Sequence, residues 1–381
     1  MKPLQIVYAF DNRVPSPQAD TEQLVSTVAA LSRRDLDICL LVPHLDDAAD
    51  PVDLCRYYGV QGSFRVRRFA APPRPRVAQK LWAPLQVARA EVVERADLVY
   101  TRNLPIALGM AALGKRVVLD TYRPWPRQYP PLRPLVRWLT RSPHFVAGIL
   151  HSELARQAYL SIGVPEKRLL VAHNAFEPSR MEPVMDRGEA RRALGLEPNR
   201  PTVVYAGRIS DDKGLDVVLE TARRCRHVHF LFVGSTSRDP FEEECRALPN
   251  VDLVPWQPFD ELSTWLYAAD VLLVPPSVDP LVEKGHTVLP MKLFAYLAAG
   301  RPILAGASPD VRELLVDGEN AVLVPPDDPG AAVEALEDLL EDEELKARLV
   351  VGAARTAGSL TWEARARRIH GFILERLEET A

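Results

Sequence analysis

Two positively charged side chains lie five positions apart, just after an apolar run. Arg208 and Lys213 follow residues 202–206, and Gly207 stands where the run ends. A glycine lets the backbone come close to a ligand, and the helical pattern that opens after Gly214 would offer free N–H groups at its N-terminus. Because an arginine grips two oxygens at once and a lysine acts as a mobile charge, this spacing predicts a diphosphate site.

The same residues allow a second interpretation. Three aspartates stand close enough in sequence to neutralise both cations: Asp211, Asp212 and Asp216. In that case Arg208 and Lys213 form ordinary surface ion pairs, which contribute little to stability. The spacing by itself leaves both alternatives open.

A second loop of the same kind follows the apolar run 271–274. The loop combines charge with glycine, and its candidate ligand-binding residues are Glu283, Gly285 and His286. The helical pattern that follows has a proline near its first turn and a glycine at its end. The backbone N–H groups of three residues would point out of that helix start: Thr287, Val288 and Leu289. This loop therefore predicts a second anion site, facing the first across the same strand ends.

Short apolar runs alternate with longer helical patterns along the chain. One series of strand-like runs is 5–10, 37–42, 98–100, 117–119 and 145–150, and a second is 202–206, 229–233, 251–254, 271–274, 302–305 and 321–324. Strands separated by helices form parallel sheets. The predicted fold class is α/β, with two doubly wound Rossmann-like domains, and ligands are expected at the carboxyl ends of the strands and in the cleft between the domains.

A proline-rich polar stretch at 177–187 is suited to a linker and sets the domain boundaries. We expect a first domain over residues 1–180 and a second over 181–360. The segment 361–381 is expected to form a helix that crosses back and packs towards the first domain, because it carries an apolar stripe.

Composition narrows the class of protein. The 381 residues are 47% hydrophobic and 26% charged, and no apolar run approaches the ~20 residues that a membrane-spanning helix needs. The N-terminus lacks the pattern of a signal peptide, and the four cysteines are scattered, so we expect a reduced cytoplasmic protein. Residues 1–180 contain 25 Lys/Arg and 16 Asp/Glu, while residues 181–381 contain 22 and 35. The basic first half suggests an anionic partner; two solvated surfaces of different charge are the alternative.

Several segments, in order along the chain, resemble glycosyltransferase family 4. They are Tyr205–Arg208 with Lys213–Gly214, Pro275–Ser277, above all Leu289–Ile303, and, more loosely, Pro165–Asn174 and Leu360–Glu363. The resemblance implies a GT-B fold, a nucleotide-diphosphate sugar bound by the second domain, and an acceptor bound by the first. It also implies transfer with retention of anomeric configuration and no required metal or cofactor.

The resemblance also assigns roles to individual residues. Arg208 and Lys213 match the catalytic pair that stabilises charge on the departing diphosphate. Lys292 matches the lysine beside the donor, although a solvated lysine on the first helical turn is the alternative. Val254 and Trp256 match the loop that contacts the nucleobase; a lid or core role for Trp256 is the alternative.

The sequence departs from the family pattern in three places. Ala295 replaces a glutamate that binds the ribose, and Thr287 falls near the position of its acidic partner, so Glu283 would have to take part through a rearranged loop. A histidine that many relatives carry near the sugar and acceptor is absent, and Thr121 or Tyr122 could hydrogen-bond the sugar instead. The first loop lacks the usual paired glycines, and Arg13 is its candidate acceptor contact, with a solvent-facing arginine as the alternative.

Two segments of the first half combine arginines with aromatic residues and contain no carboxylate. They span residues 65–90, with Trp82, and residues 123–141, with Trp125, Tyr129 and Trp138. Interfacial helices use this composition, so we expect weak association with an anionic membrane surface, which suits a lipid-linked or anionic acceptor. Nucleic acid is not an expected partner, because no recognition motif is present.

Two functions fit these observations. The first is a retaining hexosyltransferase that uses a nucleotide sugar in the cytoplasm, at the inner face of a membrane. The second is a catalytically weakened GT-B-like protein that binds sugar nucleotides or glycans or serves as a partner subunit, which the departures at Ala295 and Tyr122 favour. A GT-B epimerase fits less well, because the Leu289–Ile303 segment and the Thr361–Trp362 tail follow the transferase pattern.

Overall fold

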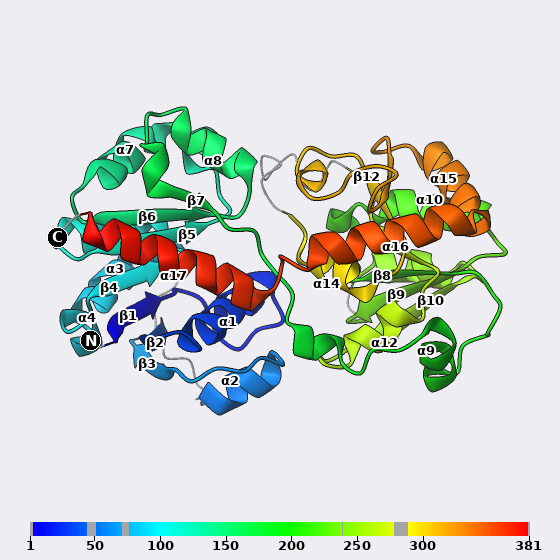
Figure 1. Ribbon diagram of the computed structural model, residues 1–381, viewed down its shortest axis with the longest axis horizontal. Coiled ribbons are helices and arrows are strands. Elements are labelled where there is room, and N and C mark those ends of the chain that lie inside the picture. Colours follow the sequence, from blue (N-terminus) through cyan, green and yellow to red (C-terminus); the bar gives the residue numbers. More distant parts are fainter. Residues whose placement is uncertain (1–2, 44–50, 71–75, 238, 278–288, 380–381) are drawn as a thin grey trace. The chain divides into compact units, whose positions relative to one another are not determined.

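The computed structural model of the chain describes residues 3–43, 51–70, 76–237, 239–277 and 289–379, apart from the side chains of 51–52 and 76–81. The chain forms two compact units (Figure 1). Unit 1 comprises Met1–Asn174 together with Trp362–Ala381, and unit 2 comprises Ala175–Thr361.

Unit 1 contains a seven-stranded parallel sheet in the order β3-β2-β1-β4-β5-β6-β7. Its strands are β1 Leu4–Ala9, β2 Leu36–Pro43, β3 Arg65–Phe69, β4 Leu98–Thr101, β5 Val117–Thr121, β6 Phe145–Leu150 and β7 Leu169–Val171. Its helices are α1 Ala19–Ser32, α2 Pro51–Tyr57, α3 Arg76–Arg89, α4 Glu91–Glu94, α5 Leu104–Ala112, α6 Trp125–Gln128, α7 Arg133–Arg141, α8 Glu153–Leu160 and α17 Trp362–Glu378. Short 3-10 turns lie at Pro130–Leu132 and Glu166–Arg168.

The C-terminal helix α17 belongs to unit 1, where it packs beside α1 and on β6 (red in Figure 1). Its buried residues include Trp362, Ile369 and Ile373, which recur at helical spacing. Two arginines of the helix are buried as well, Arg365 and Arg376. The helix thus brings charge into the interior of unit 1.

Unit 2 contains a six-stranded parallel sheet in the order β10-β9-β8-β11-β12-β13. Its strands are β8 Thr202–Ala206, β9 His229–Ser235, β10 Val251–Pro255, β11 Val271–Val274, β12 Ile303–Gly306 and β13 Val322–Val324. Its helices are α9 Arg187–Leu194, α10 Leu215–Arg224, α11 Phe241–Arg246, α12 Leu262–Tyr267, α14 Met291–Ala299, α15 Pro329–Glu341 and α16 Glu343–Ala357. Short 3-10 turns lie at Pro178–Met181, Asp211–Lys213 and Val311–Glu313.

Alternate residues of β8 enter two different cores of unit 2. Val204 packs with residues of α12 and α14, whereas Val203 and Tyr205 pack with residues of α10 and α15. A strand covered on both faces needs a nearly continuous apolar sequence, which Thr202–Ala206 has. The prediction of two doubly wound α/β domains is confirmed by the two sheets and by these helix layers.

Local signals fix where the helices of unit 2 begin and end. α9 starts with a capping box, in which the Asp186 side chain accepts from the Glu189 N–H and the Glu189 side chain accepts from the Asp186 N–H. It ends at Gly195, whose φ of 68° lies in the left-handed region.

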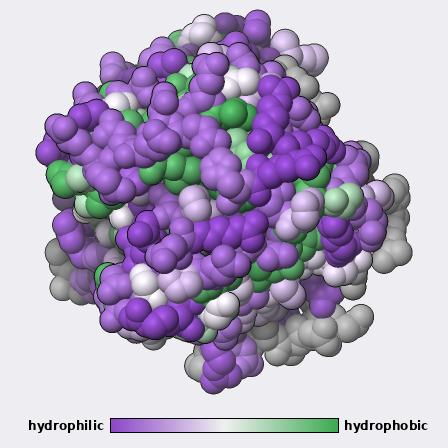
Figure 2. Space-filling model, turned by 90° about the vertical axis from the view of Figure 1, so that its right-hand side faces the viewer, coloured by the Kyte–Doolittle hydropathy of each residue, from purple (hydrophilic) through white to green (hydrophobic). Residues whose placement is uncertain are grey.

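The face that Figure 2 shows is mostly hydrophilic, with hydrophobic residues in small separate patches.

Candidate functional site

The candidate diphosphate loop of unit 2 begins where β8 ends. The Gly207 N–H donates to the Val233 carbonyl of β9 at 2.8 Å, and the φ of Gly207 is 145°. A Cβ on Gly234 would lie 2.3 Å from the Gly207 carbonyl oxygen. The ends of β8 and β9 therefore approach so closely that a side chain at Gly234 would collide with backbone, and the conformation of Gly207 favours glycine.

Arg208 and Lys213 converge on one carboxylate in this loop. Asp212 Oδ2 lies 2.6 Å from Arg208 Nη2 and 3.0 Å from Lys213 Nζ. The Ser210 hydroxyl donates to the other carboxylate oxygen. Partial burial acts to raise the pKa of Asp212, but Ser210, Lys213 and Arg208 outweigh it and lower this pKa. The structure thus contains the aspartate pairing allowed by the sequence, and the same contacts hold the two cations side by side.

Lys292 brings a third cation to the loop from the first turn of α14. Its Nζ lies 3.5 Å from the centroid of the Tyr205 ring, and a Cβ on Gly207 would be only 2.9 Å from this Nζ. Burial lowers the pKa of Lys292 well below its usual value, and the nearby Lys213 lowers it further. Lys292 is therefore half-buried over an aromatic ring beside other cations, rather than on a solvated helical turn.

Two further sequence-predicted donor positions have clear surroundings. Ala295 is partly buried against the core of unit 2, and the hydroxyl of the next residue, Tyr296, accepts from the Ala206 N–H at 2.7 Å. Leu289 is buried in the same core, so its side chain has a structural role there. The remaining predicted donor residues lie outside the described part of the chain: Glu283, Gly285, His286, Thr287 and Val288.

The two predicted nucleobase residues differ in exposure. Val254 is buried in the core of unit 2, so its side chain does not face solvent. Trp256 is 40% exposed, its backbone N–H donates to the Ser235 carbonyl, and its ring meets Phe259 edge-on at 6.0 Å between centroids. The Arg180 guanidinium lies 4.7 Å from the Phe259 centroid. An aromatic surface therefore follows the end of β10, the strand next to β9.

The predicted acceptor-side residues lie at the carboxyl edge of the unit 1 sheet. The Thr121 hydroxyl is buried and accepts from the Arg123 N–H at 3.0 Å, so it fixes the loop after β5. Tyr122 is half-buried, with the guanidinium carbons of Arg102 and Arg123 at 5.8 and 5.2 Å from its ring centroid. Arg13 is exposed in the loop after β1. The structure thus groups Tyr122 with two arginines that the sequence did not single out as site residues.

A cluster of buried ionisable residues lies next to the loop after β5 and consists of Asp120, His151 and Arg365. Asp120 is fully buried and accepts from Arg365 Nη2 at 3.0 and 3.2 Å, from the Tyr100 hydroxyl at 2.7 Å and from His151 Nε2 at 2.5 Å. Burial acts to raise the pKa of Asp120, but Arg365 and His151 hold it well below its usual value. Burial lowers the pKa of His151 to about 4, which the attraction of Asp120 only partly opposes. We therefore take Asp120 as charged and His151 as neutral.

Sequence reasoning missed this cluster because its members are far apart in the chain. Asp120 and His151 each stand at a strand end, but Arg365 comes from α17. The polar residues within the otherwise apolar strand ends were the available signal. Among the described residues, no three His, Cys, Asp or Glu side chains gather as metal ligands would.

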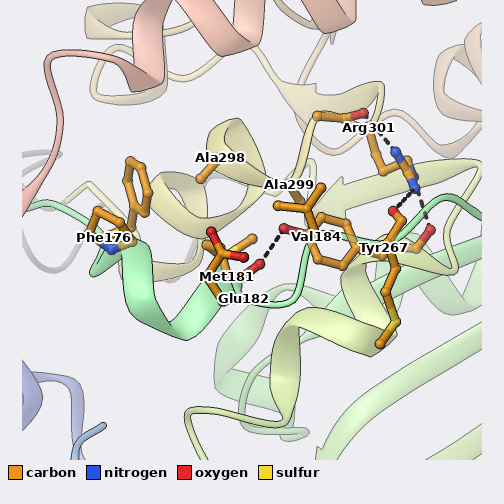
Figure 3. A pocket seen from close by; sticks show the side chains of 11 residues that line it. Phe176, Met181, Glu182, Val184, Tyr267, Ala298, Ala299 and Arg301 are labelled. Atoms are coloured by element: carbon orange, nitrogen blue, oxygen red, sulfur yellow. Dashed lines mark hydrogen bonds between the residues drawn. The ribbon is translucent and has the colours of Figure 1, made fainter. Parts of the chain in front are cut away.

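A separate cavity of about 400 Å³ lies in unit 2, away from the candidate loop (Figure 3). Its walls include Phe176, Met181 and Tyr267, and the Arg301 guanidinium donates to the carbonyls of Tyr267, Gly300 and Met185. Tyr267 and Arg301 precede β11 and β12, so this cavity lies near the amino ends of those strands. The candidate diphosphate residues follow the carboxyl end of β8, at the other edge of the same parallel sheet.

Two doubly wound Rossmann-like domains with parallel sheets are the architecture of the GT-B fold. Residues 200–342 match the family model described as glycosyl transferases group 1. The resemblance to glycosyltransferase family 4 is thereby confirmed. In the described residues, no helix is long and apolar enough to cross a membrane.

Comparison with individual proteins supports this assignment. The chain is 27% identical over 238 residues to the alpha-D-kanosaminyltransferase of Streptomyces kanamyceticus, covering 58% of each protein. The chain thus spans little more than half the length of this curated relative. In fold it is similar to a sucrose-phosphate synthase from Thermosynechococcus elongatus (TM-score 0.77, 17% identity, 99% of this chain and 100% of the other). It is also similar to Anabaena HepE in complex with UDP-glucose (TM-score 0.71, 19% identity, 99% and 100%).

Proposed function

We propose that the protein is a retaining glycosyltransferase that moves a hexose-type sugar from a nucleotide diphosphate to an acceptor. The observation that carries this proposal is the charge around Gly207. Arg208, Lys213 and Lys292 meet at one strand end, and Asp212 pairs with only two of them among the described residues. A diphosphate would neutralise the excess positive charge, and HepE, a structure of similar fold, binds UDP-glucose.

The proposed reaction needs stabilisation of the leaving group. The bond from the sugar C1 to the diphosphate oxygen breaks, a bond from C1 to the acceptor oxygen forms on the same face, and the acceptor proton passes to the departing diphosphate. Negative charge grows on the diphosphate in this step, so preorganised cations lower the barrier. Arg208 and Lys213 would stabilise this charge without a metal, Lys292 would hold the donor phosphates, and Trp256 would pack against the nucleobase.

The alternative function is a binding protein without turnover. Ala295 offers no carboxylate to a ribose, and Tyr122 stands where many relatives carry a histidine. The donor phosphates would still bind to the cations around Gly207. Turnover, rather than binding, therefore distinguishes the two functions.

Donor binding and turnover can be measured on the full chain. We expect thermal stabilisation by one family of UDP-, GDP- or ADP-sugars and slow hydrolysis of that donor, both lost in Arg208→Ala and Lys213→Ala. Arg223→Ala is the matched control, because Arg223 pairs with Glu220 on the exposed face of α10. Retention is checked by NMR of the released sugar, and metal independence by activity in EDTA. Binding without hydrolysis or transfer would favour the binding protein, and no binding of any sugar nucleotide would refute both functions.

We also propose that unit 1 associates with the inner face of an anionic membrane through α7. The buried side of this helix carries Val136, Leu139 and Thr140, and the opposite side carries Pro134, Arg137, Trp138 and Arg141. Trp138 is 48% exposed, and the nearby Leu113 at the end of α5 is 62% exposed. A hollow of about 750 Å³ beside them is lined by Arg137, Arg141 and His144. Exposed apolar groups among cations suit an interface with anionic headgroups.

Vesicle sedimentation tests the membrane proposal and compares the two basic segments. We expect binding to phosphatidylglycerol vesicles at low salt, less at high salt, and little to phosphatidylcholine. Arg137→Ser with Arg141→Ser should weaken it about 10-fold or more, since each cation contributes about 1 kcal/mol. Arg67→Ser with Arg89→Ser removes the same charge from the other segment and should have a smaller effect. No binding to anionic vesicles at low salt would refute association.

A further inference from the structure

Two arginines flank one tyrosine at the carboxyl edge of the unit 1 sheet. Arg102 follows β4 and Arg123 follows β5, and these strands are neighbours in the sheet. Their guanidinium carbons lie 5.8 and 5.2 Å from the ring centroid of Tyr122, and all three side chains are half-buried. The fold therefore holds two positive charges on one aromatic ring.

Both arginines bond to neutral acceptors. Arg102 Nη1 donates to the Asp20 backbone carbonyl at 2.6 Å, and Arg123 Nη1 donates to Gln128 Oε1 at 3.3 Å. Neither forms an ion pair with a carboxylate in the part of the chain that the structure describes. A guanidinium has five N–H donors in a fixed fork, so each arginine keeps several donors for a ligand.

The nearest buried carboxylate does not neutralise this pair. Asp120 directly precedes Thr121 and Tyr122, but it is held by both Arg365 contacts at 3.0 and 3.2 Å. Arg365 thus supplies most of the counter-charge of Asp120. Arg102 attracts Asp120 more weakly and forms no ion pair with it among the described residues, so Asp120 offsets only part of the positive charge of the two arginines.

Two further carboxylates at this edge come from the loop after β1 and from the first turn of α1. Asp11 accepts from the Asn103 amide, and Asp20 accepts from the Asn12 amide at 3.4 Å. One oxygen of Asp20, Oδ1, is buried and has no hydrogen-bond partner among the described residues. Each of these two carboxylates is therefore engaged by an asparagine amide.

We infer that Arg102 and Arg123 bind an oxyanion of the acceptor, a phosphate or a carboxylate, while Tyr122 packs against the ring that carries it. The inference rests on the proposed function, because it names the class of acceptor for the same reaction. The planar fork of arginine matches the paired oxygens of either anion. The part of the half-buried Tyr122 ring that the guanidiniums leave open would pack against the apolar face of a sugar or polyol.

Binding of simple probes to the full chain tests this inference. The nucleoside diphosphate of the donor that the chain prefers is present throughout and is written here as UDP. The probes are glucose 6-phosphate for the phosphate, glucuronate for the carboxylate, glucose as the neutral sugar and inorganic phosphate as the anion alone. We expect the phosphate or the carboxylate probe to bind at least 10-fold more tightly than glucose. In Arg102→Gln and Arg123→Gln this preference should fall about 10- to 100-fold, because charge-assisted hydrogen bonds are lost.

Matched variants separate a binding role from a structural one. Arg116→Gln removes the same charge at the amino end of β5, where Arg116 is exposed, and should leave all probes unchanged. Arg102→Lys and Arg123→Lys keep the charge and should recover part of the affinity if a variant with glutamine is unstable. The inference is overturned if no anion binds more tightly than glucose, or if both glutamine variants keep the preference. UDP binding should stay unchanged throughout, so its loss would instead count against the proposed function.

Discussion

Asp212 is expected to compete with the donor diphosphate for Arg208 and Lys213. Its carboxylate lies 2.6 Å from one cation and 3.0 Å from the other, and the side chains are 52% exposed for Asp212, 59% for Arg208 and 29% for Lys213. An exposed ion pair contributes about 0.2–1 kcal/mol, so displacing both costs about 0.4–2 kcal/mol. Solvent screening favours the lower half of this range. Asp212→Asn should therefore bind UDP about 2- to 10-fold more tightly.

The same substitution should have the opposite effect on the ligand-free protein. The pKa of Asp212 is lowered in the folded state, so its charge stabilises the fold above the pKa of the unfolded chain, and that contribution disappears as the pH falls. At neutral pH, Asp212→Asn should lose up to about 1 kcal/mol of stability without UDP. Tighter binding together with lower intrinsic stability is the signature of a competing counter-charge.

Isothermal titration with UDP at low and high salt, with thermal unfolding of the free protein, measures both effects. Asp211→Asn is the matched control, because it removes one charge from the adjacent residue, whose carboxylate accepts from the Asp212 N–H. The gain in affinity should be confined to Asp212→Asn and should shrink at high salt. Weaker UDP binding by Asp212→Asn would refute the reasoning and show that the carboxylate positions the cations for the donor. If both variants gain UDP affinity equally, the gain comes from the change in net charge and not from the contacts of Asp212.

Three further predictions concern other residues. Gly207→Ala should weaken UDP binding about 10-fold, because a Cβ at a φ of 145° strains the loop and displaces Lys292 Nζ, which would lie 2.9 Å from it. Gly195→Ala is strained as well, at a φ of 68°, but its Cβ would have no neighbour within 4 Å, so the titrated affinity for UDP should stay intact. Equal losses of affinity would contradict the argument. Arg365→Met should lower the free energy of unfolding, measured in urea, by about 3–5 kcal/mol, because Asp120 stays buried and charged. Adding Asp120→Asn to this variant should recover part of the lost stability. If no stability is recovered, the buried charge is not the cause of the loss. His151 has a pKa of about 4 in the folded protein, so it takes up a proton mainly on unfolding. The free energy of unfolding should therefore fall by up to about 1.4 kcal/mol per pH unit as the pH drops from about 6.5 to 4. The same dependence of stability on pH in His151→Gln would count against this assignment.

The sequence predicts the central strands of both sheets and the two edge strands of unit 2, β10 and β13, but it misses both edge strands of unit 1. The run Thr202–Ala206 is apolar because both of its faces are buried, and it was located correctly. By contrast, β3 at the sheet edge reads Arg65-Val-Arg-Arg-Phe69, since an edge strand tolerates charge, and its arginines were interpreted only as surface. The three-residue β7 is too short to show a period.

The candidate site divides in the same way between local and distant signals. The loop from Gly207 to Lys213 is continuous in sequence, so its glycine and cations could be read together. The cluster of Asp120, His151 and Arg365 depends on a helix more than 200 positions away, which no local pattern reports. The contact of Lys292 with Tyr205 likewise depends on how α14 packs against β8, so spacing could not separate a buried lysine from a solvated one.

Unit 2 occupies one continuous segment, Ala175–Thr361, within the chain of unit 1. Its two ends meet, because Phe176 pairs with Thr361 and the Phe176 N–H donates to the Leu360 carbonyl at 3.0 Å. A segment whose ends are adjacent can be excised or replaced without stretching the host polypeptide. Unit 2, the proposed donor-binding unit, can therefore be replaced as a whole. Recombination at these two junctions could give unit 1 a new sugar donor while every residue around Tyr122, including Arg365 from the C-terminal helix, stays in place.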